Sequence, residues 1–230
     1  MNIWSDIWRL FFPKSCLICG SSLTKSEEHI CFRCMAGLPR AHIHLRQVNE
    51  MEKSLWGKFP VERAEAYLYY IKGGDAQRIL FELKYYGNLK LAYFLGRCMA
   101  LELRSSDFFD GIDYIVPVPL HRKKLKKRGY NQSEVLAEGV ASVTGIPMAT
   151  DLLVREQYTE TQTHKGNYER WMNVKGIFGC NSWENFKGKH LLLVDDVFTT
   201  GATVVACADA LACIPDLKLS VLTLAIAGES

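Results

Sequence analysis

The sequence predicts an α/β protein in which a parallel sheet carries helices on both faces, preceded by a small module with four cysteines. Two observations predict this. After residue 60, short runs rich in β-branched and aromatic residues alternate with helical patterns, as is typical of a parallel sheet. Before residue 42, two Cys-x-x-Cys pairs stand close together. The composition agrees, because 48% of the 230 residues are hydrophobic and 23% are charged, as in ordinary globular proteins.

The alternation gives the elements of the α/β part in chain order. Strands are expected at residues 64–71, 113–120, 190–197 and 218–227, where apolar residues run together. Helices are expected at residues 73–104, with a break near Gly87, and at residues 130–145 and 201–214. The chain thus divides into an N-terminal helix and cysteine module (1–42), a connector of mixed polarity (43–60) and the α/β domain (61–230).

At the N-terminus, apolar side chains recur at helical spacing, at Ile3, Trp4, Ile7, Trp8 and Phe11. This pattern predicts a short helix docked on the body of the protein or, alternatively, one that meets a membrane surface or a partner. The segment has no basic leader and no small-residue cleavage site, so we do not expect a signal peptide. Apolar runs elsewhere fall short of the roughly 18–20 residues of a membrane-spanning helix. These features predict a cytoplasmic protein without a transmembrane segment.

The four clustered cysteines have the spacing of a metal site. Cys16 and Cys19 form one Cys-x-x-Cys pair, Cys31 and Cys34 form the second, and eleven residues separate the pairs. Two such knuckles bring four sulfurs to one point, which suits a structural Zn²⁺ with no open position for catalysis. Disulfides are the weaker alternative in a chain without a secretion signal. The other cysteines are expected to be small buried residues: Cys98, Cys180, Cys207 and Cys213.

The stretch HLLLVDDVFTTGATVV, which begins at His190, carries the clearest chemistry. Its apolar strand places Asp195 and Asp196 at a strand's carboxyl end, where open α/β sheets bind ligands. The next turn leads into a helix near residue 202, and a helix N-terminus with unpaired N–H groups holds a phosphate. Gly201 lets the backbone approach the anion closely. Hydroxyl donors come from Thr199, Thr200 and Thr203.

The two carboxylates must face another part of the same ligand, because carboxylates repel phosphate. Sugar hydroxyls are their natural partner, so the pattern indicates a phosphorylated ribose, with Mg²⁺ nearby. The alternative is an acidic strand end followed by an ordinary threonine N-cap. A nucleoside triphosphate loop is disfavoured, since the sequence contains no G-x4-G-K-[ST].

Residues 194–203 resemble the phosphoribosyl pyrophosphate (PRPP) motif of type I phosphoribosyltransferases. The resemblance implies the type I phosphoribosyltransferase fold and a catalytic ribose site at Asp195 and Asp196. It also implies that the following turn holds the 5′-phosphate. The PRPP-binding residues would then be Asp195, Asp196, Val197, Thr199, Thr200, Gly201, Ala202 and Thr203. The implied reaction transfers phosphoribose from PRPP, with Mg²⁺, to an acceptor that these residues do not identify.

Together with the cysteine module, two further segments resemble the competence protein F (ComF) family: IVPVPLHRKKLKKRGYNQSEVLA and REQYTETQTHKGNYERWMNVKGIF. This resemblance extends over nearly the whole chain. It implies a role in DNA uptake, with single-stranded DNA and a protein of the competence machinery as partners. Two classes of function follow: a phosphoribosyltransferase, and a DNA-uptake factor that binds single strands through the cysteine module and the basic run at residues 122–128.

The Pro-Val-Pro stretch must end its strand, because proline lacks a backbone donor. By resemblance, the pyrophosphate loop follows there, with Pro119, Leu120, His121, Arg122 and Lys123 as its residues. Six of the seven residues from Arg122 to Arg128 are Lys or Arg. Three interpretations of this run stay open. Its first residues neutralise pyrophosphate, its remainder binds nucleic acid with Tyr130 stacking on a base, or it is a solvated basic loop.

Residues 155–174 form a long polar stretch, and long loops are usually functional or disordered. By resemblance, this stretch is a flap that closes over the reacting centre and excludes water. The positions that match the ComF pattern are Thr159, Gln162, Thr163, Arg170 and Asn173. An unstructured connector is the alternative. Lys84, in the ComF-like stretch FELKYYGN, either reaches a phosphate or lies exposed on a helix.

Overall fold

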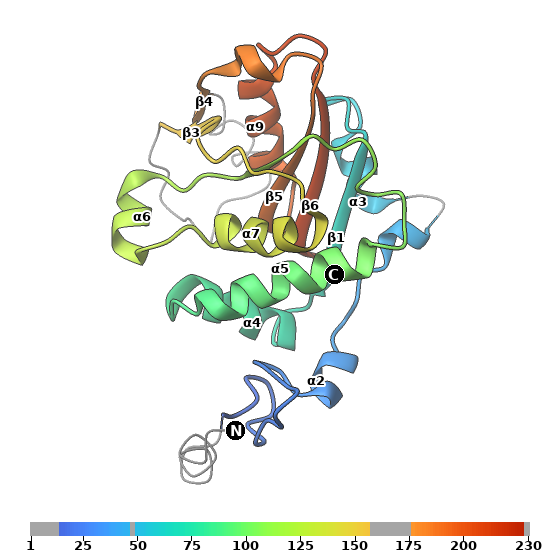
Figure 1. Ribbon diagram of the computed structural model, residues 1–230, viewed down its shortest axis with the longest axis vertical. Helices are drawn as coiled ribbons and strands as arrows, with labels where there is room; N and C mark the ends of the chain where they lie inside the picture. Colours follow the sequence, from blue (N-terminus) through green and yellow to red (C-terminus); the bar gives the residue numbers. More distant parts are fainter. Residues whose placement is uncertain (1–13, 47–48, 157–175, 228–230) are drawn as a thin grey trace.

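The central sheet has four parallel strands in the order β1–β6–β5–β2 (Figure 1). It is seen in a computed structural model that describes residues 14–46, 49–156 and 176–227. The strands are β1 (Arg63–Tyr70), β2 (Tyr114–Pro117), β5 (His190–Phe198) and β6 (Lys218–Ala227). The predicted parallel α/β fold is therefore confirmed.

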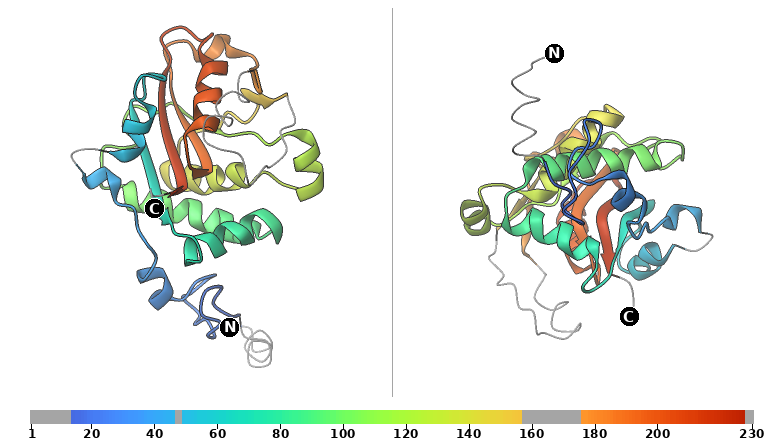
Figure 2. Two further views of the ribbon diagram at one scale, coloured as in Figure 1. Left: turned by 180° about the vertical axis from the view of Figure 1, so that it is seen from behind. Right: turned by 90° about the horizontal axis from the view of Figure 1, so that it is seen from below.

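Helices cover both faces of this sheet (Figure 2). One face carries α4 (Asp75–Tyr85), α5 (Leu89–Leu103) and α7 (Gln132–Thr144), and the other carries α3 (Glu50–Leu55) and α9 (Ala202–Leu211). Along β5, Leu192 and Val194 pack in the first apolar cluster, whereas Leu191 and Leu193 pack in the second. Because both faces are buried, β5 and β6 are apolar over most of their length.

Helices α5 and α7 approach each other closely through two glycines. A Cβ atom added at Gly96 would lie 2.1 Å from the backbone oxygen of Leu136, and one added at Gly139 would lie 2.3 Å from that of Tyr93. Such distances are shorter than any van der Waals contact, so neither position has room for a side chain. The close approach fixes α7 against the rest of its layer, and α7 also packs on β5.

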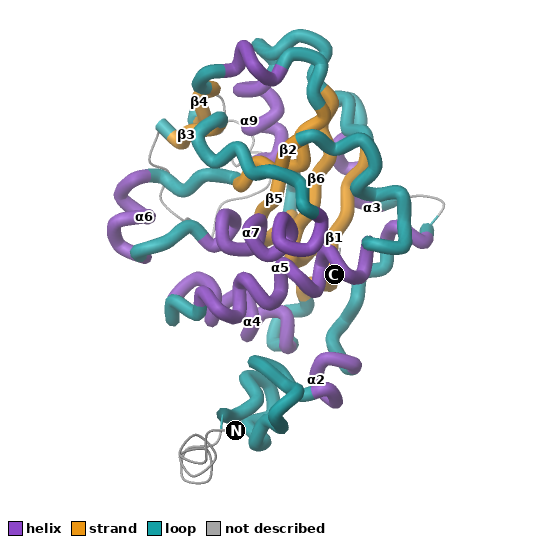
Figure 3. The backbone as a smooth tube through the Cα atoms, viewed as in Figure 1, coloured by secondary structure: helices purple, strands orange, loops and turns teal. Residues whose placement is uncertain are grey.

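The cysteine module, residues 14–41, consists mostly of loop and includes the short helix α2 (Phe32–Ala36) (Figure 3). Its last residues, 39–41, run antiparallel to β1 at the edge of the sheet. There Ala41 N donates to Tyr67 O at 3.1 Å. An ion pair between Arg40 and Glu102 of α5, at 2.8 Å, fastens the same segment to the helical layer.

The segment at residues 43–60 also contributes to the core. It contains the 3₁₀ turn η1 (Ile43–Leu45) and helix α3, whose Met51 and Leu55 are fully buried in the apolar cluster that includes α9. The segment therefore packs with the α/β domain. The division of the chain at residues 42 and 60 stays a prediction.

The basic run forms helix α6 (Arg122–Arg128), so the interpretation as a solvated basic loop, one of the three left open, is wrong in its conformation. Both ends of this helix are capped. His121 accepts a hydrogen bond from Lys123 N at 3.1 Å, and Gly129 ends the helix with a left-handed φ of 84°. These flanking residues favour a helix where the repulsion between like charges would oppose one.

A second, smaller sheet joins β3 (Leu153–Arg155) to β4 (Phe178–Cys180) in antiparallel register, and the 3₁₀ turn η2 (Trp183–Phe186) follows it. The predicted flap residues Thr159, Gln162, Thr163, Arg170 and Asn173 lie outside the described residues, and so does the apolar segment at residues 1–13. In the part of the chain that is described, no helix has the length and apolar character needed to cross a membrane.

Candidate functional site

The paired acids Asp195 and Asp196 lie near the carboxyl end of β5, a strand that continues past them to Phe198. Both are buried, with 8% and 4% of their surface exposed. The backbone N–H of Asp196 donates to Asp195 Oδ1 at 2.9 Å. Buried carboxylates are costly unless polar partners satisfy them. The partners of this pair therefore indicate what the site can do.

Helix α7 supplies a partner for each acid from its first turn. Gln132 Nε2 donates to Asp196 Oδ2 at 2.9 Å, and Ser133 Oγ donates to Asp195 Oδ1 at 2.9 Å. Arg128, at the end of α6, donates to the side-chain oxygen of Gln132. The two acids are thus held by neighbouring residues of one helix start, which fixes their relative orientation.

The residues just before α7 extend these contacts to other elements. Asn131 caps the helix by accepting from Ser133 N at 3.2 Å, and its amide donates to Val118 O at 3.0 Å. Tyr130 donates its hydroxyl hydrogen to Leu83 O in α4. We call residues 128–133 the clamp segment, because it ties the acid pair to the end of β2 and to α4. The sequence marked these residues as part of a ComF-like motif, but it gave no role to Asn131, Gln132 or Ser133.

Lys84 of α4 completes the surroundings of the acid pair. Its Nζ lies 3.0 Å from Asp196 Oδ2. Burial lowers the pKa of Lys84, but the negative charges of Asp196 and Asp195 outweigh burial and raise it. For Asp195, burial and the negative charge of Asp196 raise the pKa to about 7. Asp195 therefore gains or loses a proton near neutral pH.

The turn that follows β5 has the form expected of an anion site. Gly201 is the N-cap of α9, with a left-handed φ of 75° and no side chain that could cap the helix. A Cβ atom there would lie 2.9 Å from the ring of Phe198 and 3.1 Å from Leu55. Helix α9 begins at Ala202, as predicted. The threonines of the turn are not fully buried: Thr199, Thr200 and Thr203.

Residues 119–123 leave the sheet beside the acid pair. The backbone N–H of Val118 donates to Val194 O at 2.9 Å, so the chain stays paired with β5 up to the residue before Pro119. Leu120 and His121 follow and are half-buried, and α6 then begins at Arg122. The predicted pyrophosphate residues thus start one strand away from Asp195 and Asp196.

Several cations converge on this region from different elements. Burial lowers the pKa of Lys124, and the positive charges of Arg155, Arg128 and Lys84 lower it further. Burial also lowers the pKa of Arg155 in β3, against the opposing negative charge of Asp195. Positive charges that repel one another in this way favour the binding of a polyanion between them. The sequence assigned no role to Arg155, whose place beside the acids depends on the fold.

The four predicted cysteines come together into a group that can hold a metal ion. Their Sγ atoms all lie within 4.8 Å of one another. Cys31 N donates to Cys16 Sγ at 3.3 Å, and hydrogen bonds from Ser21 lower the pKa of Cys19 to about 6. A lowered pKa favours the thiolate, which is the form that binds metals. Of the other cysteines, Cys207 is buried as predicted, but the prediction is wrong for Cys213, which is exposed.

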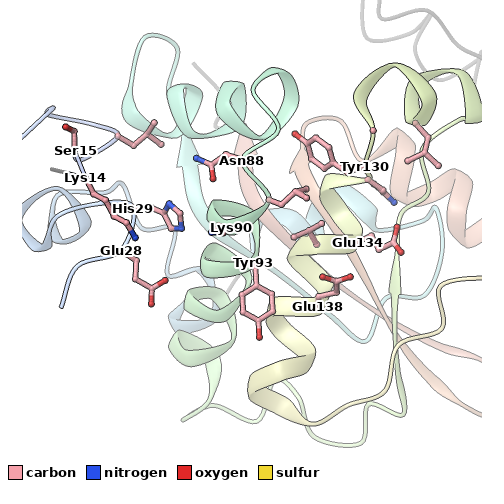
Figure 4. Close-up of a pocket in the computed structure, with 16 residues that line it drawn as sticks. Lys14, Ser15, Glu28, His29, Asn88, Lys90, Tyr93, Tyr130, Glu134 and Glu138 are labelled. Carbon is pink, nitrogen blue, oxygen red and sulfur yellow. The ribbon is translucent and has the colours of Figure 1, made fainter. Parts of the chain in front are cut away.

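A large groove of about 1,010 Å³ lies between the cysteine module and helices α5 and α7 (Figure 4). Glu134 and Glu138 of α7 line one side of it, and Lys14 and His29 of the module line the other. Carboxylates along one wall repel phosphates. Lys14 and Lys90 also line the groove, so its lining carries charges of both signs.

Comparisons with known proteins identify relatives along most of the chain. No family model matches it. It is 29% identical over 199 residues to DNA utilization protein YhgH of Escherichia coli K12, which covers 85% of this chain and 83% of YhgH. It is 26% identical over 203 residues to competence protein ComFC of Bacillus subtilis, covering 86% and 79% of the two chains. A stretch of 91 residues is 35% identical to competence protein F of Haemophilus influenzae, covering 39% and 40%.

Among solved structures, the chain is similar to a glutamine PRPP amidotransferase from B. subtilis, with a TM-score of 0.40 and 19% identity over 61% of this chain. It is also similar to an allosteric regulatory enzyme of purine biosynthesis, with a TM-score of 0.37 and 21% identity over 56% of this chain. The chain spans 30% and 25% of the lengths of these two enzymes. The sequence relatives and the four-cysteine group confirm the resemblance of this chain to the ComF family.

Proposed function

We propose that the chain binds PRPP at the acid pair and transfers its phosphoribosyl group to an acceptor, releasing pyrophosphate. The order of features at the end of β5 carries this proposal: two buried carboxylates, a threonine-rich turn, and a helix start capped by glycine. A helix N-terminus favours an anion, whereas carboxylates favour hydroxyl groups. PRPP supplies both kinds of group within one small molecule.

In this proposal, each part of PRPP has its own residues. The 5′-phosphate lies on the turn at residues 199–203, and the ribose hydroxyls donate to Asp195 and Asp196. The pyrophosphate faces residues 119–123 and the nearby cations Lys124, Arg128 and Arg155. Mg²⁺ bound together with PRPP adds positive charge at the leaving group. Closure over the site by Thr159, Gln162, Thr163 and Arg170 stays a prediction.

The reaction forms a bond between the acceptor and the anomeric carbon of the ribose while the bond from that carbon to pyrophosphate breaks. Positive charge develops on the ribosyl group and negative charge on the leaving group, so carboxylates on one side and cations on the other stabilise the transition state. Gln132 and Ser133 are positioning residues, because they hold the acids through hydrogen bonds. The displacement requires no covalent intermediate with a side chain.

Calorimetric titration with PRPP and Mg²⁺ tests the proposal. The parent protein is expected to bind PRPP, and the Asp195→Asn/Asp196→Asn variant is expected to lose binding by at least about a hundredfold, since both hydroxyl acceptors lose their charge. Asp209→Asn is the matched control, because this carboxylate is exposed on α9, away from the acid pair. Absence of PRPP binding to the folded parent, or equal binding to the double variant, would contradict the proposal.

A second candidate function is binding of single-stranded DNA. Its support is the names of the relatives, DNA utilization protein and competence protein, together with the exposed cations of α6. Phosphate contacts give a salt-dependent affinity with a slope of about 0.7 per contact on single strands. Replacing Lys123, Lys126 and Lys127 by Gln should lower that slope by about 1–2, measured by fluorescence anisotropy across a salt series. An unchanged slope would sink this candidate.

For the cysteine group we propose a structural Zn²⁺. Tetrahedral zinc with Zn–S bonds of about 2.3 Å keeps its sulfurs about 3.8 Å apart. The distance between Cys19 Sγ and Cys31 Sγ, 3.7 Å, agrees with this geometry. Elemental analysis of the purified protein should find one zinc per chain, and a metal other than zinc would correct this assignment.

A further inference from the structure

The groove between the cysteine module and helices α5 and α7 is long, and two helices form its floor. Its volume of about 1,010 Å³ reaches the upper limit of small-molecule pockets, which measure about 300–1,000 Å³. Lining residues recur at helical spacing on α7, at Asn131, Glu134, Val135 and Glu138, and α5 adds Leu89 and Tyr93. The groove thus follows about two turns of α7, or roughly 10 Å. Its shape is that of a site for a third helix laid between two others.

Apolar side chains of the groove stay exposed in the part of the chain that the structure describes. Leu89 and Tyr93 of α5 are 43% and 39% exposed, and Leu125 of α6 is 39% exposed. All three line the groove, together with the half-buried Leu17 and Val135. Apolar residues that stay exposed together commonly mark an interaction site. An occupant with an apolar face would therefore be stabilised by covering them.

Two carboxylates on one wall of the groove have no cationic partner among the described residues. Glu134 and Glu138 are four residues apart, so they lie on the same side of α7 (Figure 4). None of the ion pairs within residues 14–46, 49–156 and 176–227 involves either side chain. Burial and the negative charges of Glu138 and Asp151 raise the pKa of Glu134. This wall therefore favours an occupant that donates hydrogen bonds and repels one that carries phosphates or carboxylates.

The N-terminal segment, residues 1–13, carries the side chains that the groove requires. Its apolar residues recur at the spacing of one helix face, at Ile3, Trp4, Ile7, Trp8 and Phe11. From Ile3 to Phe11 a helix rises about 12 Å, which matches the roughly 10 Å of the groove along α7. Trp4 and Trp8 are four residues apart, as are Glu134 and Glu138. Each indole has one N–H group, which needs an acceptor when the ring is buried.

The attachment of this segment lies at the groove itself. Lys14 and Ser15, the first residues that the structure describes, both line the groove. The segment before Lys14 therefore needs no linker to reach it. Pro13 stands between the apolar stripe and the module, and a helix usually ends before a proline. The chain can thus change direction at this residue and lay a helix back on α5 and α7.

We propose that residues 1–13 form an amphipathic helix whose apolar stripe packs into this groove, with the indole N–H groups of Trp4 and Trp8 donating to Glu134 and Glu138. The docked helix joins the cysteine module to α5 and α7 of the sheet domain. It also contacts Tyr130 and Asn131 of the clamp segment, which line the same groove. The inference does not depend on the proposed function.

Two leucines of α5 allow a matched test on the full chain. Leu89 and Leu101 are 43% and 50% exposed, but only Leu89 is among the described lining residues of the groove. Hydrogen exchange with mass spectrometry should show the amides of residues 4–12 exchanging at least about tenfold more slowly than in an unstructured peptide. Leu89→Glu should remove this protection by about tenfold, and Leu101→Glu should change it less than twofold. Circular dichroism should show that both variants keep the parent's fold.

Variants of the segment provide the second arm. Trp8→Glu should remove the protection as Leu89→Glu does, whereas Ser5→Glu, on the polar face of the expected helix, should keep it. A benzophenone amino acid in place of Trp8 should form a photocrosslink to α5 or α7 of the same chain. The inference is overturned if residues 4–12 are unprotected in the parent, if the two leucine variants behave alike, or if the crosslinks join only different chains. Protection that appears only with vesicles of phosphatidylglycerol and phosphatidylethanolamine would overturn it as well, because the segment would then bind a membrane surface.

Discussion

The sheet domain and the cysteine module are stabilised by different means. Strands β5 and β6 are buried over nearly their whole length, and two apolar clusters fill the space between the sheet and its helices. In the module, residues 14–41, the buried side chains are Cys16, Ile30, Cys31, Leu38 and Ala41. Two of these five are members of the sulfur group, and the first four pack against the apolar cluster of α4, α5 and α7. The module therefore has too small an apolar core of its own to be stable without another source of free energy.

The two regions therefore differ in what stabilises them. The sheet domain has enough buried apolar surface to tolerate two carboxylates in its interior, next to Lys84 and the clamp segment. For the module, the proposed stabilising element is the metal held by its four sulfurs. We therefore expect the regions to respond independently to metal removal, to overpacking and to a change of pH.

Metal removal should have the largest effect, confined to the module. Structural zinc contributes roughly 10–16 kcal/mol in zinc-finger peptides. A strong chelator should therefore abolish amide protection in residues 14–41 while β5 and β6 keep theirs, as measured by hydrogen exchange with mass spectrometry on the full chain. Cys34→Ser should reproduce this loss, and Cys213→Ser, at an exposed cysteine outside the group, should not. Equal loss of protection in both regions would contradict their independence.

Overpacking between α5 and α7 should have the next largest effect, confined to the sheet domain. In Gly139→Ala, the new methyl group would collide with the backbone of α5, and we expect unfolding free energy to fall by about 3 kcal/mol. Chemical denaturation followed by circular dichroism measures this change. Glu138→Ala is the control, because this neighbouring side chain is exposed and its loss should cost less than about 0.5 kcal/mol. Similar stability of the two variants would mean that α5 can move away from α7.

Removing the charge of Asp195 should have the smallest effect, and it should depend on pH. The folded pKa of about 7 lies above the ordinary value of 3.8, so the folded state holds more protons between these values. The stability of the parent should therefore fall as pH rises from about 4 to 7 and stay level above that range. Asp195→Asn should be more stable than the parent at pH 8, and this advantage should disappear as the pH falls to about 4.

Thermal unfolding across this pH range checks the prediction, with Asp209→Asn as the exposed control. A stability difference that does not vary with pH would show that Asp195 is already ionised well below neutral pH. The Asp195 substitution should leave the metal dependence of the module unchanged. Its effect on stability therefore reports on the buried acids of the sheet domain alone.

Much of the fold could be predicted from local sequence. The strands and helices of the sheet domain follow from apolar runs and from breakers such as Gly87, which has a left-handed φ of 68° between α4 and α5. The basic run was harder, because like charges suggest a loop while the capping residues His121 and Gly129 favour a helix. Local capping decided the outcome at that place.

The site was predictable only in part, for a physical reason. Asp195, Asp196 and the turn after them lie together in sequence, so their motif stands out. Their partners Gln132 and Ser133 lie more than sixty residues earlier, and only the packing of α7 on β5 brings them near. The ion pair of Lys84 with Asp196 has the same origin. Such contacts leave no local pattern.

The short antiparallel segment at residues 39–41 has a consequence for the free chain in solution. Strand β1 is at the edge of the sheet, and two of its outer backbone groups are paired with this segment: Ala41 N donates to Tyr67 O, and Tyr69 N donates to Pro39 O. Unpaired strand edges template aggregation. A chain that loses its metal and releases the module would uncover this edge to other chains. The proposed metal would thereby also protect solubility, and we expect metal starvation to reveal itself first as self-association.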